Sequence, residues 1–238
     1  MPGWTIDFPD GAALVTGGAG DIGRPIVEAL REAGLQVGVL DLAESDERHH
    51  VSGDITDPAA VEAGVRQLAA ELGDFGTVVC AAGVQSEHPL EELSLEEFRR
   101  VLDASLTGAF LTARAVAPRM VSGGSIVVLS SGLGTRGMAR GVHYASAKAG
   151  VVGLAKSLAL ELGTRGIRAN AVAPGPINSR MLDGMDRGAA ASRGIEAIPL
   201  GRIGDPEDVV GPVLFLLSSA SAYVTGAVLH VNGGMLMP

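Results

Sequence analysis

Short apolar runs alternate with longer stretches of mixed polarity along most of this chain. The runs at 12–15, 77–80 and 125–131 are continuous rather than alternating, which is typical of strands covered on both faces. Between such runs, apolar residues recur three or four positions apart, and this spacing predicts helices. The regular exchange of strand and helix predicts an α/β fold of the Rossmann type, with a doubly wound parallel sheet and helices on both faces.

Glycine, proline and capping residues mark the ends of the expected elements. Pro58 after Asp57 indicates one helix start, and Ser94 with Glu97 forms a capping box at another. We expect about seven strands, at 12–15, 36–40, 49–52, 77–80, 125–131, 168–172 and 227–231, and helices at about 23–33, 58–72, 94–118, 144–163 and 205–217.

The helix expected from Tyr144 to Gly163 is apolar on almost every side. After Lys148 it carries only Lys156 and Glu161 as charged residues. A helix without a polar face is buried on both sides, and one side is expected to lie against another subunit. The sequence therefore predicts a homo-oligomer, either a dimer or a tetramer.

Composition fits a single domain that spans residues 1–238. The chain is 47% hydrophobic with 34 glycines, and its net charge of -9 argues against nucleic acid or an anionic membrane as a partner. The lone Cys80 has no disulfide partner, and the histidine pair His49-His50 lacks further metal ligands nearby, so no metal site is predicted. With neither a signal peptide nor a membrane-spanning run in view, we expect a cytoplasmic protein.

A glycine-rich turn follows the first strand and precedes the first helix. It reads Thr-Gly-Gly-Ala-Gly-Asp-Ile-Gly over residues 16–23. Such glycines let the backbone approach a pyrophosphate, and the helix N-terminus offers free N–H groups. The turn is thus expected to bind a dinucleotide, although a glycine-rich turn without a ligand is the alternative reading of this motif alone.

Asp41 closes the second strand, about 20 residues beyond the glycines. A carboxylate there accepts hydrogen bonds from the hydroxyls of the adenine ribose and repels a 2'-phosphate. Because no Arg or Lys stands at 18–20 or 42–43, the sequence favours NAD over NADP. Asp54, beyond the third strand, is a candidate acceptor for the adenine amino group or an ordinary turn residue.

Tyr144 and Lys148 are the candidate catalytic pair. Four positions apart, they lie on one face of a helix, so the ammonium can lie beside the phenol and lower its pKa, which is ordinarily near 10. Ser131, at the end of an apolar run, can hydrogen-bond the oxygen whose proton moves. The three side chains suit the interconversion of an alcohol and a carbonyl. Taken alone, a Tyr and a Lys at this spacing are more often ordinary helix surface.

From about residue 11 to 234 the ordered motifs resemble those of the short-chain dehydrogenases/reductases (SDR). The resemblance implies that Tyr144 is the acid/base, that Lys148 lowers its pKa and binds the nicotinamide ribose, and that Ser131 orients the substrate oxygen. It implies cofactor contacts at Gly17, Gly20, Asp21, Ile22, Gly23, Asp41, Asp54, Ile55, Ala81, Ala82, Gly83, Tyr144, Lys148, Pro174, Gly175, Ile177 and Ser179. Substrate contacts are expected from Ser131, Leu133, His143, Tyr144 and Met181, under a lid at 177–200.

His143 is the least secure of these substrate contacts. At the start of a helix, a histidine that faces solvent is the favoured interpretation.

Two departures from the family pattern bear on activity. Asp21 replaces the usual second glycine, where it either caps the following helix or repels the pyrophosphate. Ser105 replaces the asparagine that completes the catalytic tetrad, and a serine there would keep the proton relay at reduced efficiency.

The sequence thus predicts an NAD(H)-dependent oxidoreductase that interconverts a secondary alcohol and a ketone. A 3-oxoacyl-carrier-protein ketoreductase and a catalytically weak NAD-binding sensor or scaffold protein are the alternatives. The small-molecule substrate is left open, because the residues expected to line the pocket are mostly small or aliphatic.

Overall fold

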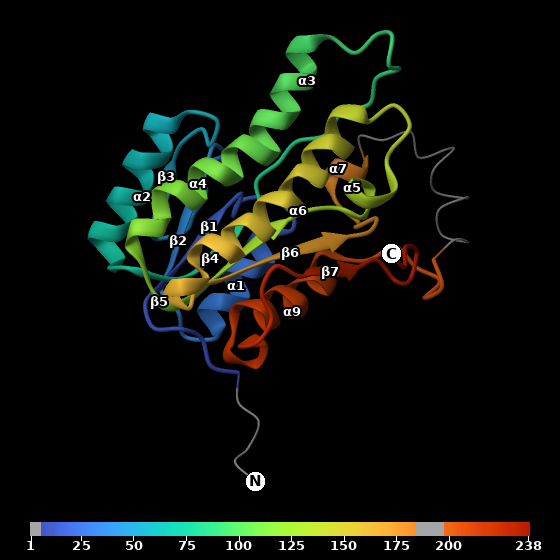
Figure 1. The fold of residues 1–238 in the computed structure, drawn as a ribbon. Coiled ribbons are helices and arrows are strands. Elements are labelled where there is room, and N and C mark those ends of the chain that lie inside the picture. The colour runs from blue at the N-terminus through green and yellow to red at the C-terminus, as the bar shows by residue number, and fades with distance from the viewer. Residues whose placement is uncertain (1–5, 184–197) are drawn as a thin grey trace.

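Seven parallel strands form one sheet at the centre of the molecule in this computed structural model, which describes residues 6–183 and 198–238 (Figure 1). The strand order is β3-β2-β1-β4-β5-β6-β7. The chain reverses its direction of winding between β1 and β4, and ligands of such sheets bind beyond the carboxyl ends of the strands at that point. The strands are β1 (Ala12–Thr16), β2 (Val37–Asp41), β3 (His50–Ser52), β4 (Phe75–Cys80), β5 (Met120–Leu129), β6 (Arg168–Pro174) and β7 (Val228–Val231).

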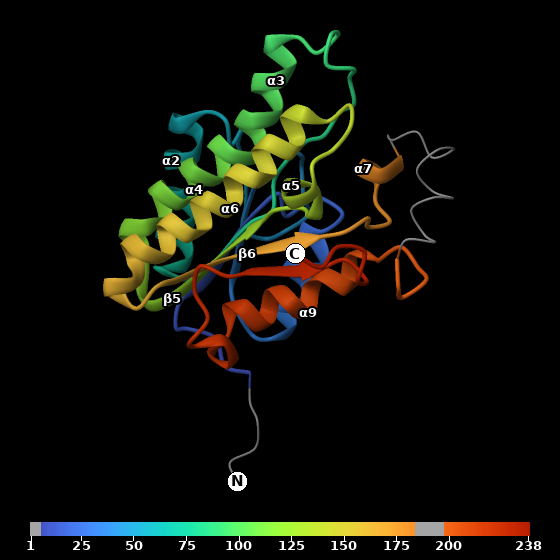
Figure 2. The ribbon, with the colours of Figure 1, turned by 45° about the vertical axis from the view of Figure 1, so that its right-hand side comes forward.

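Helices cover both faces of the sheet, and Figures 1 and 2 show the two layers from different sides. Helices α2, α4 and α6 pack on one face, while α1 and α9 pack on the other. The helices are α1 (Gly23–Glu32), α2 (Pro58–Leu72), α3 (Leu95–Leu102), α4 (Gly108–Val116), α5 (Gly132–Arg136), α6 (Val142–Leu162), α7 (Arg180–Asp183) and α9 (Pro206–Leu217). The predicted doubly wound parallel sheet is confirmed.

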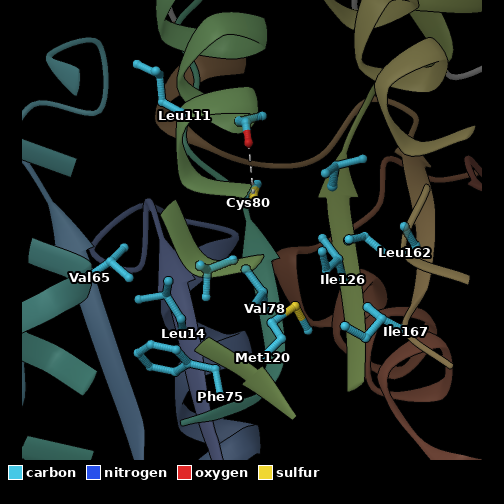
Figure 3. Close-up of a cluster of buried hydrophobic side chains, with 14 of the residues drawn as sticks. Leu14, Val65, Phe75, Val78, Cys80, Leu111, Met120, Ile126, Leu162 and Ile167 are labelled. Atoms are coloured by element: carbon cyan, nitrogen blue, oxygen red, sulfur yellow. Dashed lines mark hydrogen bonds between the residues drawn. The ribbon is translucent and has the colours of Figure 1, made fainter. Parts of the chain in front are cut away.

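An aliphatic core joins the sheet to the helices of the first face (Figure 3). Leu14, Val78 and Ile126 come from three neighbouring strands and are fully or almost fully buried. Cys80 belongs to this cluster, and burial raises the pKa of its thiol to about 12. A thiol so rarely ionised is a poor nucleophile, in agreement with its interpretation as a core residue.

One predicted helix is interrupted. Instead of a continuous helix over 94–118, α3 ends at Leu102 and α4 begins at Gly108, with a π-helical turn at Asp103–Thr107 between them. The turn holds one extra residue and turns Ser105 inward, where it is 2% exposed. Apolar residues recur three or four positions apart straight through this turn, at Phe98, Leu102, Leu106 and Ala109, so the sequence pattern does not reveal it.

Helix α6 begins at Val142, two residues before its predicted start, and buries only one of its sides within the chain. Its side chain Leu160 is 84% exposed, and Phe110 of α4 is 44% exposed. This outward apolar face is the one expected to meet another subunit. Among the described residues, no helix is both long enough and apolar enough to cross a membrane.

Candidate active site

The predicted site residues converge at the carboxyl ends of β1, β2, β4, β5 and β6. Gly17 lies directly after β1 with a φ of +73°, and a Cβ there would come within 2.4 Å of the backbone nitrogen of Ala82. A Cβ on Gly23 would meet the carbonyl oxygen of Gly17 at 2.0 Å. The turn at 16–23 therefore packs backbone to backbone against the loop 81–83, and only glycine fits at these two positions.

The N-terminus of α1 suits an anionic ligand. Its N-cap is Ile22, and within the described part of the chain no side chain caps the helix there. Arg24 donates its N–H to the carbonyl oxygen of Gly20 and Pro25 has none, so Gly23 offers the N–H of this first turn, and the helix dipole adds a partial positive charge. These features fit the pyrophosphate of a nicotinamide dinucleotide.

Asp41, the last residue of β2, is fixed against the glycine-rich turn. Its Oδ2 accepts a hydrogen bond of 2.9 Å from the N–H of Ala19, and its Oδ1 accepts one of 3.0 Å from the N–H of Ala43. The carboxylate is therefore held in place at the edge of the turn.

Asp54 and Ile55 follow β3. One carboxylate oxygen of Asp54 accepts hydrogen bonds of 2.8 Å from both the N–H and the hydroxyl of Thr56. Asp54 therefore has the role of an ordinary turn residue, which was the second interpretation of this position. The side chain of Ile55 packs towards α4, where a Cβ on Gly108 would lie 2.5 Å from its Cδ1. Any contribution of Ile55 to a cofactor site would come from its backbone.

One of the two roles predicted for Asp21, the cap of α1, is wrong. Asp21 does not cap α1; instead, its carboxylate accepts hydrogen bonds from Arg180, at 2.7 Å from the backbone N–H and 2.9 Å from Nε. The physical reason is that Arg180 opens the short helix α7, whose first N–H groups lack intrahelical partners. The cation also offsets the negative charge that Asp21 brings to the turn.

Ser131, Tyr144 and Lys148 come together as predicted from the end of β5 and the first turns of α6. The Lys148 ammonium lies 5.7 Å from the centroid of the Tyr144 ring and donates a 2.8 Å hydrogen bond to the carbonyl oxygen of Leu129. The hydroxyl of Ser130 holds the backbone of Lys148, at 2.8 Å from its carbonyl oxygen. The pair is thus anchored to the sheet from two directions.

The pKa values of the pair differ from expectation. Burial raises the pKa of Tyr144 to about 12, an effect opposed by its hydrogen bond with Ser131. Burial also lowers the pKa of Lys148 to about 8. The expected depression of the tyrosine pKa by Lys148 is therefore absent, because desolvation outweighs an ammonium that is directed at a backbone carbonyl. At neutral pH the site holds a protonated phenol.

Ser105 lies beside the lysine. A Cβ on Gly83 would lie 3.1 Å from the Ser105 hydroxyl oxygen and 3.2 Å from Lys148 Nζ, so both polar atoms surround this glycine. The hydroxyl is buried and has no hydrogen-bond partner among the described residues. A buried hydroxyl without a partner beside an ammonium is suited to hold a water in a proton relay.

β6 ends at Pro174, which pairs with Val231 of β7, and Gly175 follows it. A Cβ on Gly175 would lie 2.7 Å from the Cβ of Asn232, which accounts for the glycine. Ile177 is buried and pairs with Gly204, while the hydroxyl of Ser179 donates to the carbonyl oxygen of Ile177 at 3.2 Å. Leu133, the second residue of α5, donates its N–H to the Ser131 hydroxyl at 3.2 Å. Met181 is 40% exposed. Of the lid expected at 177–200, residues 184–197 lie outside the described part.

His143 does not face solvent, contrary to its favoured interpretation. Its side chain is 0% exposed, and its Nε2 lies 2.8 Å from the hydroxyl of Ser86. In this conformation it offers no surface to a substrate. The sequence reasoning missed Ser86 and Glu97 as its companions, because they lie more than 40 positions away and no local pattern connects them.

Comparison with known proteins agrees with this geometry. A family model described as Enoyl-(Acyl carrier protein) reductase matches residues 17–236. The 3-oxoacyl-[acyl-carrier-protein] reductase FabG of Escherichia coli (strain K12) is 36% identical over 247 residues, which cover 98% of this chain and 100% of that protein. The chain belongs to the short-chain dehydrogenase/reductase family.

Solved structures of SDR proteins share its fold. The short-chain dehydrogenase/reductase (glucose/ribitol dehydrogenase) from Brucella melitensis superposes with a TM-score of 0.90 at 28% identity, covering 99% of this chain and 100% of its own. A blue fluorescent protein from a metagenomic library, solved in complex with NADPH, gives a TM-score of 0.88 at 31% identity, covering 96% and 99%. The chain is accordingly an SDR oxidoreductase that uses a nicotinamide cofactor.

Proposed function

We propose that this SDR protein is an NAD(H)-dependent oxidoreductase that interconverts a ketone and a secondary alcohol. The observation that carries the proposal is the meeting of Ser131, Tyr144 and Lys148 at the carboxyl edge of the sheet, next to the glycine-rich turn. When bound, the nicotinamide ring supplies or accepts a hydride. The three side chains manage the proton of the substrate oxygen.

Ketone reduction is the direction that these residues favour at neutral pH. With its pKa raised to about 12, Tyr144 carries the proton that a carbonyl oxygen needs as it becomes an alcohol. Ser131 donates a second hydrogen bond to the same oxygen. In the oxidative direction Tyr144 must lose its proton, which positive charge near the phenol promotes.

Asp41 supports NAD as the preferred cofactor. Its two hydrogen bonds to backbone N–H groups fix the carboxylate before any ligand arrives, so it cannot swing away from a 2'-phosphate without losing them. A fixed negative charge at this place favours ribose hydroxyls over a phosphate.

A 3-oxoacyl-carrier-protein reductase is the second candidate. It is favoured by the names of the relatives, including FabG of Vibrio cholerae, which is 35% identical over 94% of this chain, and by the protonated Tyr144. The two candidates share the reaction at the carbonyl and differ in the substrate. A β-ketoacyl thioester reduced far faster than simple ketones would favour the second.

We further propose that the protein works as a homo-oligomer on a small molecule. The outward apolar face of α4 and α6, with Phe110 and Leu160, supports this. Monomeric soluble proteins seldom expose several large apolar side chains close together. Light scattering of the purified chain measures the subunit number.

The test follows NADH and NADPH oxidation with a panel of ketones, and the reverse reaction with the matching alcohols. We expect turnover with NADH, and a loss of at least about 10³-fold in Tyr144→Phe. Tyr144→Phe removes only the reacting hydroxyl, so unchanged cofactor affinity in this variant is the control. Cofactor binding without turnover on any substrate would refute the proposal and favour a sensor or scaffold protein.

A further inference from the structure

A polar cluster extends from the buried His143, immediately before Tyr144, to the protein surface at Arg100. It joins His143 at the start of α6 to Ser86 in the loop after β4 and to Glu97 of α3. The His143 Nε2 is 2.8 Å from the Ser86 hydroxyl, which in turn donates to Glu97 Oε1. Arg100 extends this hydrogen-bond network, donating bonds of 2.7 Å from Nε and Nη2 to the two carboxylate oxygens of Glu97.

Counting protons in this cluster fixes the tautomer of His143. Hydrogen bonds from Arg100 and Ser86 lower the pKa of Glu97 to about 2, so its carboxylate only accepts. Ser86 has a single hydroxyl proton and gives it to Glu97. Its oxygen must therefore accept from His143, which carries its proton on Nε2 and leaves a lone pair on Nδ1.

The other ring nitrogen explains why a charged His143 would not be tolerated. The Nδ1 atom is buried and has no hydrogen-bond partner anywhere in the described ranges 6–183 and 198–238. A buried lone pair without a partner costs less than a buried N–H donor without a partner combined with a full positive charge. Protonation would create both, one residue away from Tyr144.

We propose that His143 is a positioning residue for Tyr144, and that it functions only as the neutral tautomer with its proton on Nε2, held by Ser86 and through it by Glu97. The bond fixes the first turn of α6 to the loop after β4 and to α3. Proton uptake at Nδ1 leaves the bond from Nε2 to Ser86 in place, but the buried charge and the N–H without a partner then loosen the turn that carries Tyr144. The proposal rests on the proposed function, because Tyr144 is the acid that it positions.

The direction of the pH dependence follows from the groups around the ring. Burial has the largest effect and lowers the pKa of His143 below 6.5, with His88 and Arg100 acting in the same direction and Glu97 against them. Just below pH 6.5 the folded protein thus binds fewer protons at this site than the unfolded chain does. The unfolding free energy therefore decreases as the pH falls below 6.5, and by the proposal kcat decreases with it.

The first test needs no turnover. The chain contains five histidines, so ¹⁵N-histidine labelling gives a simple spectrum in which His143→Gln identifies the signal of His143 by its loss. We expect a neutral ring with its proton on Nε2 at pH 7.5. A proton on Nδ1, or a charged ring at that pH, would overturn the proposal whatever the enzyme catalyses.

The second test compares the pH profiles of kcat between pH 5.5 and 8. We expect wild-type kcat to fall with acid below pH 6.5, with its midpoint below that value, and kcat of His143→Gln to stay level over the same range within about twofold. Glutamine places an amide N–H near the position of Nε2 and does not titrate, so this variant keeps the bond to Ser86. His88→Gln is the matched control, because it removes a neighbouring imidazole whose centroid is 6.1 Å from that of His143.

The assignment would be overturned if kcat of folded His143→Gln fell at low pH as much as that of the wild type. It would also be overturned if the fall disappeared in His88→Gln. If His143→Gln fails to fold, Ser86→Ala serves instead, with an expected loss of kcat of about tenfold and little change in KM. Unchanged kcat in Ser86→Ala would count against a positioning role. An inactive wild-type enzyme would reject the proposed function alone, since the tautomer measurement still stands.

Discussion

The carboxylate of Asp21 accepts hydrogen bonds from both the backbone N–H and the Nε of Arg180, at 2.7 and 2.9 Å. A residue of the glycine-rich turn is thereby joined to a helix 159 positions away, on the far side of the site. The acidic residue that seemed at odds with a pyrophosphate is thus paired with a cation. Its charge at the turn is offset as long as that pair is intact.

Arg180→Ala should weaken NAD binding by about three- to tenfold, because the Asp21 carboxylate keeps the backbone N–H of residue 180 but loses the cation that offsets its charge beside an anionic ligand. The double variant Asp21→Asn with Arg180→Ala should recover most of this loss, because the carboxylate is removed as well. Isothermal titration of the four proteins at low and high salt measures both effects. Additive losses in the double variant would contradict the compensation argued here.

Asp41→Asn should raise the ratio of kcat/KM for NADPH over NADH at least about tenfold. The amide keeps the shape of the side chain but removes the charge that repels a 2'-phosphate. It also keeps only one acceptor oxygen for the N–H groups of Ala19 and Ala43, at a cost of about 1 kcal/mol in unfolding free energy. Steady-state kinetics and urea unfolding separate the two effects, and an unchanged cofactor ratio would refute the role of Asp41.

Lys148→Met should stabilise the cofactor-free protein at pH 7 while abolishing turnover. The pKa of Lys148 falls from 10.5 to about 8, so between those values the unfolded chain binds more protons and stability rises with pH. Below pH 8 the buried charge costs about 3 kcal/mol, of which about 1 kcal/mol is offset by the hydrogen bond to Leu129.

Urea unfolding at pH 7 and 9.5 checks this prediction. Methionine should add about 2 kcal/mol at pH 7, and the rise in stability between the two pH values should disappear. Lys156→Met, on the exposed side of the same helix, is the control and should change neither quantity by more than about 0.5 kcal/mol. A destabilised Lys148→Met protein would contradict the argument.

Much of the fold follows from the sequence because its signals are local. Ser94 caps α3 by accepting the N–H of Glu97 at 3.1 Å, and Asp57 caps α2 by accepting the N–H of Ala59 at 2.9 Å. The other half of the predicted capping box does not form, because the Glu97 carboxylate bonds to Ser86 and Arg100 instead. Continuous apolar runs identified the strands because parallel strands are buried on both faces. The parallel order then brought Ser131 to the same edge as the glycine-rich turn.

The missed features depend on contacts between distant segments. Arg180, the partner of Asp21, is 159 positions away, and Ser86, the partner of His143, is 57 positions away. No local sequence pattern predicts either contact. The pKa of Tyr144 is raised, not lowered as predicted, for a related reason. The spacing of Tyr144 and Lys148 along a helix can be predicted from the sequence. Their burial, which governs both pKa values, depends on how the whole chain packs.

Ser105→Ala tests the proton relay with little effect on stability. The hydroxyl is buried without a partner among the residues described, so its removal leaves no other group unpaired, and the unfolding free energy should change by less than about 1 kcal/mol. If the hydroxyl holds a water near Lys148, kcat should fall about three- to tenfold with KM unchanged, and the solvent isotope effect on kcat should rise. Unchanged kcat and isotope effect would instead assign the relay to backbone groups of the π-helical turn, which the alanine variant leaves intact.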